Sequence, residues 1–260
     1  MLFAVDIGNT NIHVGFFNKD ELTAEFRMGT DPTRADDEYA WMLRSLAEFQ
    51  GVVLSEIHGV IIGSVIPSVT HTVRNAIQKI TSAPILTVGP GIKTGFPIRI
   101  DDPAELGADI AATVAATVAR VGAPAIVADF GTATVISAID KDGAYVGSSI
   151  LPGIQMSLDA LHSAELLPGV HSSDRTVPTL GKNSADCMRA GVLRGQVMAV
   201  CGFAELWQKA PELSKDAPLV VSGGFADYLL PYLPRGTVHI PLLTLQGLNV
   251  IYRLNEKKKR

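Results

Sequence analysis

The chain has 260 residues, of which 47% are hydrophobic and 18% are charged, and its formal net charge is −4. This composition excludes an intrinsically disordered protein, and the negative charge leaves no general attraction to nucleic acid or to an anionic membrane surface. No apolar run reaches the length of about eighteen residues that a membrane span needs, and Asp6 interrupts the N-terminal apolar stretch too early for a signal peptide. We therefore expect no nucleic acid and no membrane among its partners.

The two cysteines, Cys187 and Cys201, fall in one predicted helical stretch. The helix between them would hold the two residues about 21 Å apart along its axis, which is too far for a disulfide. We therefore expect reduced thiols and a cytoplasmic location.

The first half of the chain opens with three predicted strands and continues with alternating helices and strands. Apolar residues that step by three and four predict an amphipathic helix at 39–49, which Asp36 or Asp37 could cap. This order favours a mixed sheet with helices packed against it. The predicted strands are 2–6, 11–17, 22–27, 59–67 and 84–89, and a second predicted helix spans 68–80.

The second half repeats this order. A predicted helix that starts after Pro103 and ends near Arg120 joins the halves, and its start signal is the sequence at 102–105. The polar segment 168–178 predicts a loop beside the site, and the basic residues 257–260 predict a solvated terminus. The predicted strands are 125–129, 133–139, 144–150, 218–224 and 237–241, and the predicted helices are 153–164, 182–209 and 243–254.

A short pattern that suits a phosphate occurs twice. An apolar run ends in Asp-x-Gly and small hydroxyl or amide residues at 6–10 and again at 129–134. The glycine lets backbone N–H groups approach a phosphate and the hydroxyls add donors, whereas the Asp would hold a cation or a metal-bound water. One copy alone fits ordinary turn chemistry. Two copies 123 residues apart (129 − 6) indicate a duplicated domain that clamps nucleotide phosphates between its halves.

Longer motifs carry a resemblance that covers essentially the whole chain. The chain resembles the type III pantothenate kinases, members of the acetate kinase, sugar kinase, Hsc70 and actin superfamily. The resemblance implies an α/β fold of two duplicated ribonuclease H-like (actin-like ATPase) half-domains, 1–115 and 116–260, each a mixed five-stranded sheet flanked by helices, with a cleft between them. The motifs are DIGNTN (6–11), DEY (37–39), SVIP (64–67), PAELGAD (103–109), DFGTAT (129–134), ILPGI (150–154), LGKNSADCMRAG (180–191), SGGFA (222–226) and LTLQGLNVIY (243–252).

The resemblance implies that ATP phosphorylates the terminal hydroxyl of pantothenate to 4'-phosphopantothenate, the first step of coenzyme A synthesis. Asp109 matches the family's catalytic acid/base, which would orient the attacking hydroxyl and accept its proton. Asp129 matches the ligand of a monovalent cation such as K⁺ or NH₄⁺, and Asp6 would hold Mg²⁺ through a water. The implied ATP-binding residues are Asp6, Ile7, Gly8, Asn9, Thr10, Asn11, Ile12, His13 and Thr132, and the implied substrate-binding residues are Ile100, Gly107, Ala108, Asp109, Ile110 and Ser184.

Asp109 also has a structural interpretation, because an Asp near a helix start is commonly a cap or a partner of the helix dipole. If the helix starts at the signal in 102–105, however, Asp109 lies in the second turn and has no capping role.

A homodimer is a further implication. The resemblance places the helical stretch 182–209 at the subunit interface, with Ser184 reaching the partner's pantothenate site. This stretch carries apolar residues beyond what a solvated helix needs, namely Met188, Val192, Val197 and Val200.

The chain departs from the family pattern on the acceptor side. Ile110 stands where an Arg of the pantothenate pocket is usual, and Ile100 stands where a Tyr is usual. Losing an Arg that faces the substrate carboxylate would weaken the free energy of substrate binding by about 2–5 kcal/mol if nothing replaces it. Arg99 could compensate, although its side chain would point the other way if 97–101 is a strand. Two alternatives therefore stay open: a kinase of another small hydroxyl compound, and a nucleotide-binding regulator without turnover, against which the retained Asp109 argues.

Overall fold

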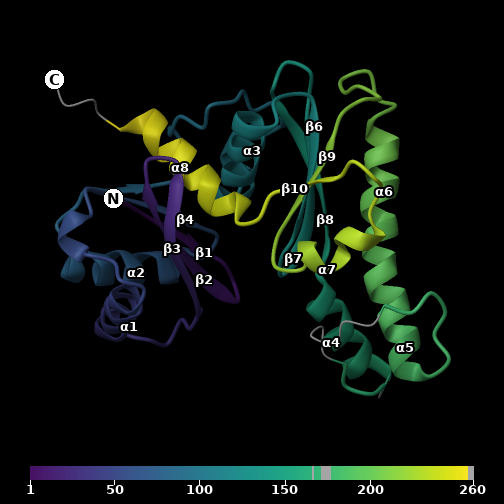
Figure 1. Cartoon of the computed structure of the whole chain (residues 1–260), viewed down its shortest axis with the longest axis horizontal. Coiled ribbons are helices and arrows are strands. Elements are labelled where there is room, and N and C mark those ends of the chain that lie inside the picture. Colours follow the sequence, from purple (N-terminus) through teal and green to yellow (C-terminus); the bar gives the residue numbers. More distant parts are fainter. Residues whose placement is uncertain (166, 171–176, 257–260) are drawn as a thin grey trace. The chain divides into compact units, whose positions relative to one another are not determined.

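The computed structural model describes residues 1–165, 167–170 and 177–256. The chain forms two compact units, each built on one five-stranded sheet (Figure 1). The first unit contains residues 1–96 and 101–119 together with the last helix, and the second contains residues 97–100 and 120–242. The predicted loop at 168–178 falls largely on residues outside this description, as does the basic end at 257–260.

The first unit has the strand order β3-β2-β1-β4-β5, in which β1, β2 and β3 are antiparallel and β4 and β5 run parallel to β1. Alternate side chains of its strands form a core with α1 and α2 on one face of the sheet. The elements are β1 (Leu2–Ile7), β2 (Asn11–Asn18), β3 (Glu21–Gly29), α1 (Asp36–Phe49), η1 (Leu54–Glu56), β4 (Gly59–Ser64), α2 (Pro67–Ile80), β5 (Ile85–Thr87), η2 (Pro103–Glu105), α3 (Ala108–Arg120) and α8 (Leu243–Asn255).

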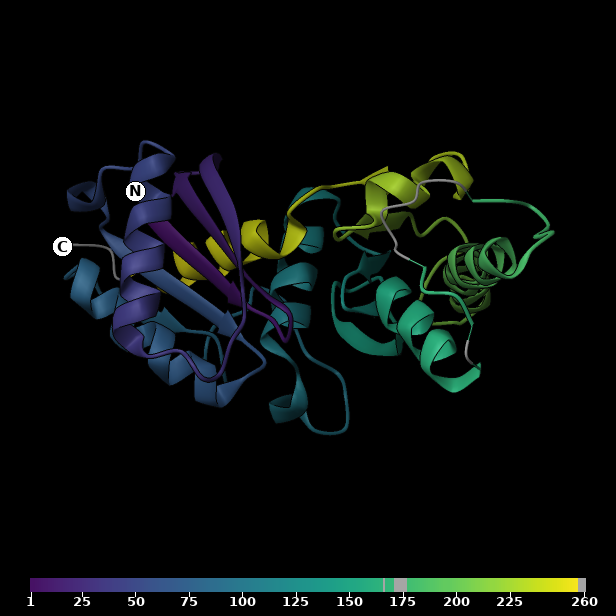
Figure 2. The same ribbon diagram turned by 90° about the horizontal axis from the view of Figure 1, so that it is seen from below.

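The last helix packs on the other face of the first sheet, where Figures 1 and 2 both show α8 in yellow beside the purple strands. Glycines make room for it. A Cβ on Gly59 of β4 would lie 1.8 Å from the Tyr252 hydroxyl oxygen, and a Cβ on Gly247 would lie 1.7 Å from the Ala112 carbonyl oxygen of α3. The prediction of two sequential half-domains had placed 243–254 in the second. The structure places α8 in the first unit because its apolar side packs on β1 and β4.

The second unit has the strand order β10-β9-β6-β7-β8, in which β6, β7 and β8 are antiparallel and β9 and β10 run parallel to β6. Read from β8, this order is β8-β7-β6-β9-β10, which matches β3-β2-β1-β4-β5 strand for strand. The duplicated α/β fold with two mixed five-stranded sheets is therefore confirmed. The elements are β6 (Ala125–Phe130), β7 (Ala133–Ile139), β8 (Tyr145–Pro152), α4 (Ile154–Glu165), α5 (Ser184–Arg189), η3 (Ala190–Arg194), α6 (Gly195–Trp207), β9 (Leu219–Ser222), α7 (Ala226–Leu229), η4 (Leu230–Tyr232) and β10 (Val238–His239).

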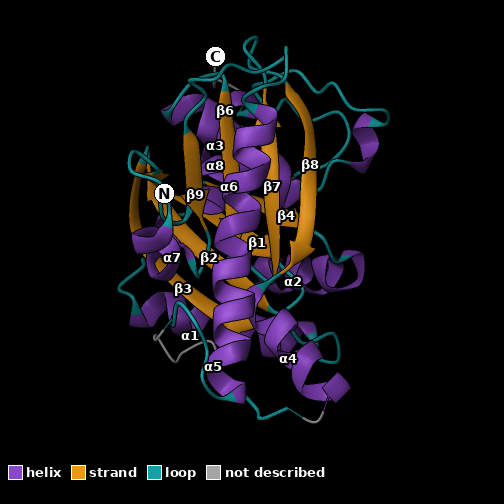
Figure 3. Cartoon of the chain, turned by 90° about the vertical axis from the view of Figure 1, so that its right-hand side faces the viewer, coloured by secondary structure: helices purple, strands orange, loops and turns teal. Residues whose placement is uncertain are grey.

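Helix α6 covers one face of the second sheet, as Figure 3 shows. The predicted helix at 182–209 is in fact α5, a π-helical turn over Ala190–Arg194, and α6 in succession. The four apolar residues on which the dimer argument rested lie in the core under this helix, with exposed fractions of 8% or less. Their apolar character is therefore explained by packing within the chain, and they do not support a subunit interface.

The predicted helix after Pro103 is divided. Asp102 Oδ1 accepts a hydrogen bond of 2.9 Å from the Ala104 backbone N–H and caps only the 3₁₀ turn η2. Leu106 then has an extended backbone, and α3 begins at Ala108. Asp109 therefore lies in the first turn of α3 rather than in a second turn.

None of the helices in the described part of the chain combines the length and the apolar character that crossing a membrane requires.

Candidate functional site

The first Asp-x-Gly segment is the tight turn between β1 and β2. The Gly8 N–H donates to the Asn11 carbonyl oxygen at 3.0 Å and closes the tip, and the Thr30 hydroxyl donates to the Gly8 carbonyl at 2.7 Å. Asn9, Thr10 and Asn11 are exposed at this tip. The turn therefore presents amide and hydroxyl donors to solvent, and these two hydrogen bonds hold its backbone in place.

Not every residue of this turn can offer its side chain. Ile7 and Ile12 pair with each other and are fully buried in the core of the first unit. If they bind ATP, they do so through backbone groups alone.

Asp6 and His13 face each other across the β1–β2 pair, and Arg27 is the partner of His13 on β3. Directly paired residues share a face of a sheet, so the three form a polar row. His13 Nε2 lies 2.6 Å from Glu25 Oε2 and 3.4 Å from Arg27 Nε. Burial lowers the pKa of His13 below its usual range, and the hydrogen bond to Glu25 only partly opposes this effect.

The second Asp-x-Gly segment is the matching turn between β6 and β7. The Gly131 N–H donates to the Ala133 carbonyl at 3.1 Å, and Thr132 is exposed at the tip. Asp129 pairs with Ser222 of β9, just as Asp6 pairs with Gly63 of the equivalent strand β4. The two carboxylates therefore occupy the same position in two sheets of the same order.

The backbone after β9 approaches Asp129 closely. Gly223 has φ +96°, and a Cβ there would lie 2.4 Å from Asp129 Oδ1 and 2.5 Å from the Phe130 backbone nitrogen. Only a glycine fits both the backbone conformation and the space, so this residue helps to define the position of Asp129.

The acceptor-side residues lie at the start of α3. Ala108 is buried, and Asp109 and Ile110 are half-buried. Asp109 Oδ1 accepts a 2.8 Å hydrogen bond from the Ile110 backbone N–H, which ties the carboxylate to the first turn of the helix. Gly107, directly before the helix, accepts from the Ala111 N–H at 2.9 Å.

Ile100 and Ser184 belong to the second unit. Ile100 is half-buried and ends the short segment 97–100, which joins the edge of β8 through the bridge between Ile98 and Tyr145. Ser184 is exposed at the first position of α5, where Asn183 Oδ1 caps the helix by accepting from the Asp186 N–H at 2.9 Å. Within single units the structure thus brings together residues 6–13, residues 107–110, and Asp129 with Thr132.

Arg99 does not have a free guanidinium. Its Nη1 lies 2.7 Å from Asp140 Oδ2 and 3.0 Å from Asp142 Oδ2, and these carboxylates raise its pKa further. Both partners come from the turn between β7 and β8. Arg99 is therefore committed within the second unit and is a weak candidate to replace an Arg at position 110.

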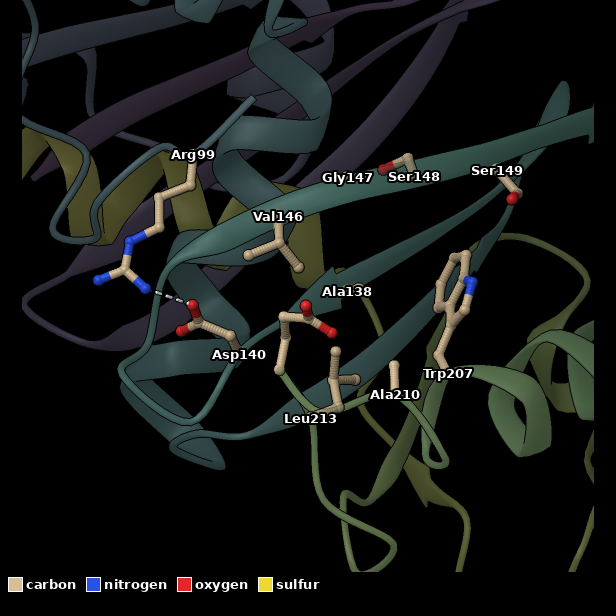
Figure 4. A pocket seen from close by; sticks show the side chains of 11 residues that line it. Arg99, Ala138, Asp140, Val146, Gly147, Ser148, Ser149, Trp207, Ala210 and Leu213 are labelled. Carbon is tan, nitrogen blue, oxygen red and sulfur yellow. Dashed lines mark hydrogen bonds and ion pairs between the residues drawn. The ribbon is translucent and has the colours of Figure 1, made fainter. Parts of the chain in front are cut away.

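A cavity of about 630 Å³ lies next to Arg99. Figure 4 shows Arg99 and Trp207 on opposite sides of it. Arg99, which was considered as a replacement for the missing Arg, lines this cavity, whereas none of the site residues implied by the resemblance does. Its lining is Arg99, Ala138, Asp140, Val146, Gly147, Ser148, Ser149, Trp207, Ala210, Glu212 and Leu213.

In the described residues, no group of three or more His, Cys, Asp or Glu side chains is placed to hold a metal ion. A bound cation would therefore take most of its ligands from a substrate, from water or from backbone carbonyls.

Two solved structures share the fold at low sequence identity. The ADPNP-bound activator of 2-hydroxyisocaproyl-CoA dehydratase from Clostridium difficile has a TM-score of 0.57 and 11% identity, with 98% of this chain and 94% of that chain covered. Component A of (R)-2-hydroxyglutaryl-CoA dehydratase from Acidaminococcus fermentans has a TM-score of 0.55 and 12% identity, with 98% and 99% covered.

Sequence relatives are much closer. A family model described as type III pantothenate kinase matches residues 2–206. Type III pantothenate kinase from Moorella thermoacetica is 41% identical over 98% of this chain and 100% of the relative. The enzyme of that name from Geobacillus kaustophilus is 37% identical over 100% of both chains. The chain therefore belongs to the type III pantothenate kinase family.

Proposed function

We propose that the protein transfers the γ-phosphoryl group of ATP to the terminal hydroxyl of pantothenate and forms 4'-phosphopantothenate and ADP. The observation that carries the proposal is the repeated Asp-x-Gly turn at the same position in two sheets of the same order, in a chain of this family. Each turn exposes amide or hydroxyl donors beside a carboxylate, which suits nucleotide phosphates and their cations. The nucleotide-binding residues are 6–13 and Thr132, with Ile7 and Ile12 contributing backbone groups.

Asp109 would act on the acceptor. The hydroxyl oxygen attacks the γ-phosphorus, the bond to the β–γ bridging oxygen breaks, and the hydroxyl proton passes to the Asp109 carboxylate. One carboxylate oxygen of Asp109 is tied to the Ile110 N–H. Within the described residues the other oxygen makes no hydrogen bond, so it can accept one from a substrate hydroxyl. Gly107, Ala108, Ile110 and Ile100 would line the acceptor side.

The cations have different supports. Mg²⁺ would be held mainly by the phosphates and, through a water, by Asp6, where it neutralises charge on the transferring group. A monovalent cation, K⁺ or NH₄⁺, would be bound by Asp129. The close approach of the Gly223 backbone to Asp129 supports a fixed position for that carboxylate.

A homodimer rests on a different face of α6 from the one that the sequence suggested. The exposed residues of α6 are Gly195, Met198 (68%), Gly202, Glu205 and Leu206 (62%), of which Glu205 alone is charged. Such a face would suit a second copy of the helix. Ser184, exposed at the start of α5, would then reach the partner's acceptor site. A cytoplasmic location would agree with two cysteines that are both free thiols.

Ile110 gives no charge for the pantothenate carboxylate, and Arg99 is already paired. This favours, as the second candidate, a kinase of another small hydroxyl compound that lacks a carboxylate.

A coupled assay of ADP release tests both candidates. The protein is assayed with pantothenate, with pantothenyl alcohol and with no acceptor, in K⁺ and in Na⁺ buffers. The proposal predicts release that needs pantothenate and is faster in K⁺. Release that needs the uncharged alcohol instead would support the second candidate, and ATP binding with no release in any condition would support a regulator.

A further inference from the structure

The helical stretch of the second unit changes its winding just before α6. The π-helical turn over Ala190–Arg194 adds a residue to a turn, and such turns are frequent near functional sites. Arg194, the last residue of this turn, is anchored by its Nε, which donates to the Pro178 carbonyl at 2.8 Å. The side chain that follows, Gln196, is 6% exposed and points into the unit.

Gln196 holds the end of β8. Its Nε2 donates to the Pro152 carbonyl oxygen at 2.6 Å. The next residue, Gly153, uses its N–H to donate to the Thr132 carbonyl at 3.1 Å. A Cβ on Gly153 would lie 2.1 Å from the Thr132 carbonyl oxygen and 2.6 Å from that of Gly131, so the two backbones are in direct contact. Two hydrogen bonds therefore connect the Gln196 amide, through Pro152 and Gly153, to Thr132 at the tip of the second Asp-x-Gly turn.

Two buried polar atoms belong to Gln196 and to Thr134 of β7. Gln196 Oε1 and the hydroxyl oxygen of Thr134 are both buried and have no hydrogen-bond partner among the described residues. Thr134 lies on β7 and pairs with Leu151 of β8, the residue before Pro152. An apolar residue at position 196 would leave no buried atom unpaired, so the hydrogen bond that the Gln196 amide makes, rather than packing alone, explains a polar side chain here.

We propose that Gln196 is a positioning residue for the nucleotide. It fixes the Pro152 carbonyl and, through Gly153, holds the Gly131–Thr132 turn in the conformation in which Thr132 meets phosphate. The inference rests on the proposed nucleotide-binding role of that turn. It concerns ATP, not pantothenate, because the linked residues lead to the turn and to no acceptor-side residue.

The test compares two glutamines of the same helical stretch. Gln208, at the other end of α6, makes the same kind of bond: its Nε2 donates to the Ala217 carbonyl at 2.8 Å. In both Gln196→Met and Gln208→Met a side chain of similar length loses the donor. We expect Gln196→Met to raise the KM for ATP, and the Kd of a non-hydrolysable ATP analogue, about three- to tenfold. Gln208→Met should leave both unchanged, and the KM for pantothenate should change less than twofold in either variant.

Thermal unfolding of both variants separates positioning from stability. A purely structural role predicts that the two variants lose similar stability and bind nucleotide alike, and this outcome would overturn the inference. Equal increases in both KM values of Gln196→Met would overturn it too. If Gln196→Met does not fold, Gln196→Leu also removes the donor, with a shorter apolar side chain. If the wild type binds the ATP analogue but releases no ADP with pantothenate, the proposed function fails, and the analogue's Kd still tests the role of Gln196.

Discussion

Replacing Gly223 with alanine tests how the structure fixes Asp129. Two costs follow from the geometry. The backbone at Gly223 has φ +96°, which a residue with a Cβ adopts at a cost of about 1–2 kcal/mol. The new Cβ would also lie 2.5 Å from the Phe130 backbone nitrogen and 2.4 Å from Asp129 Oδ1, and relieving such crowding costs about 1–3 kcal/mol more.

Gly236 provides the matched control. It belongs to the same unit and has φ +90°, but a Cβ there would meet no atom within 4 Å. Gly236→Ala should therefore show the backbone cost alone. Since a chain of this size loses about 2–4 °C for each kcal/mol, the midpoint of thermal unfolding should be about 2–12 °C lower in Gly223→Ala than in Gly236→Ala.

Activity gives the second readout of the same variants. If Asp129 binds the monovalent cation, Gly223→Ala should raise the K⁺ concentration for half-maximal ADP release about tenfold, because each 1.4 kcal/mol of lost binding corresponds to that factor. Gly236→Ala should leave it unchanged. Equal unfolding midpoints and equal K⁺ dependence in the two variants would refute the reasoning.

Three further predictions concern other parts of the molecule. Burial lowers the pKa of His13 below 6.5, so the unfolded chain binds this proton first as the pH falls. The stability that is present above about pH 6.5 is therefore lost as the pH falls through the folded pKa. Urea titrations at several pH values should show this loss in wild type and in the control His71→Gln, whose site is exposed, and a smaller loss in His13→Gln. Ile110→Arg should lower the KM for pantothenate about tenfold or more, since a guanidinium would pair with the carboxylate; an unchanged KM in steady-state assays would count against a pantothenate pocket at the start of α3. Light scattering should show a dimer at micromolar concentration that Met198→Glu dissociates, and a monomeric wild type would contradict the proposed face of α6.

The sheets and their turns were predictable because their signals are local. Each Asp-x-Gly turn follows an apolar run and precedes another, and the glycine requirement is satisfied by residues adjacent in sequence. The duplication also follows from the repeat, because a pattern that occurs twice in the same order indicates a duplicated unit. The five-stranded mixed sheet was implied by the family resemblance, and the order of its strands was not predicted.

The placement of α8 was not predictable in the same way. Its apolar side, which includes Leu245, Leu248 and Ile251, shows that one face is buried but not which sheet covers it. Gly59 and Gly247 decide this, because they leave room for Tyr252 and for the α3 backbone. Such complementarity appears only when distant segments are seen together.

The start of α3 shows how a correct local signal can be assigned to the wrong element. Asp102 and Pro103 do begin a helical turn, but it is a 3₁₀ turn that ends at Glu105. The extended backbone at Leu106 separates it from α3 and moves Asp109 into the first turn. The dimer argument failed for a different reason: apolar residues such as Val197 cannot be divided between core and surface by periodicity when the helix contains a π turn.

The most direct test of the account is to identify the product of the reaction by mass spectrometry. Wild-type protein, ATP, Mg²⁺ and K⁺ are incubated with pantothenate, and the same is done with Asp109→Asn. The account predicts that the wild type adds one phosphoryl group to pantothenate, and that Asp109→Asn lowers the rate about 10²–10⁴-fold while the Kd of an ATP analogue stays nearly unchanged. The account would be contradicted if the wild type bound ATP but left pantothenate unmodified, or if Asp109→Asn turned over at the full rate.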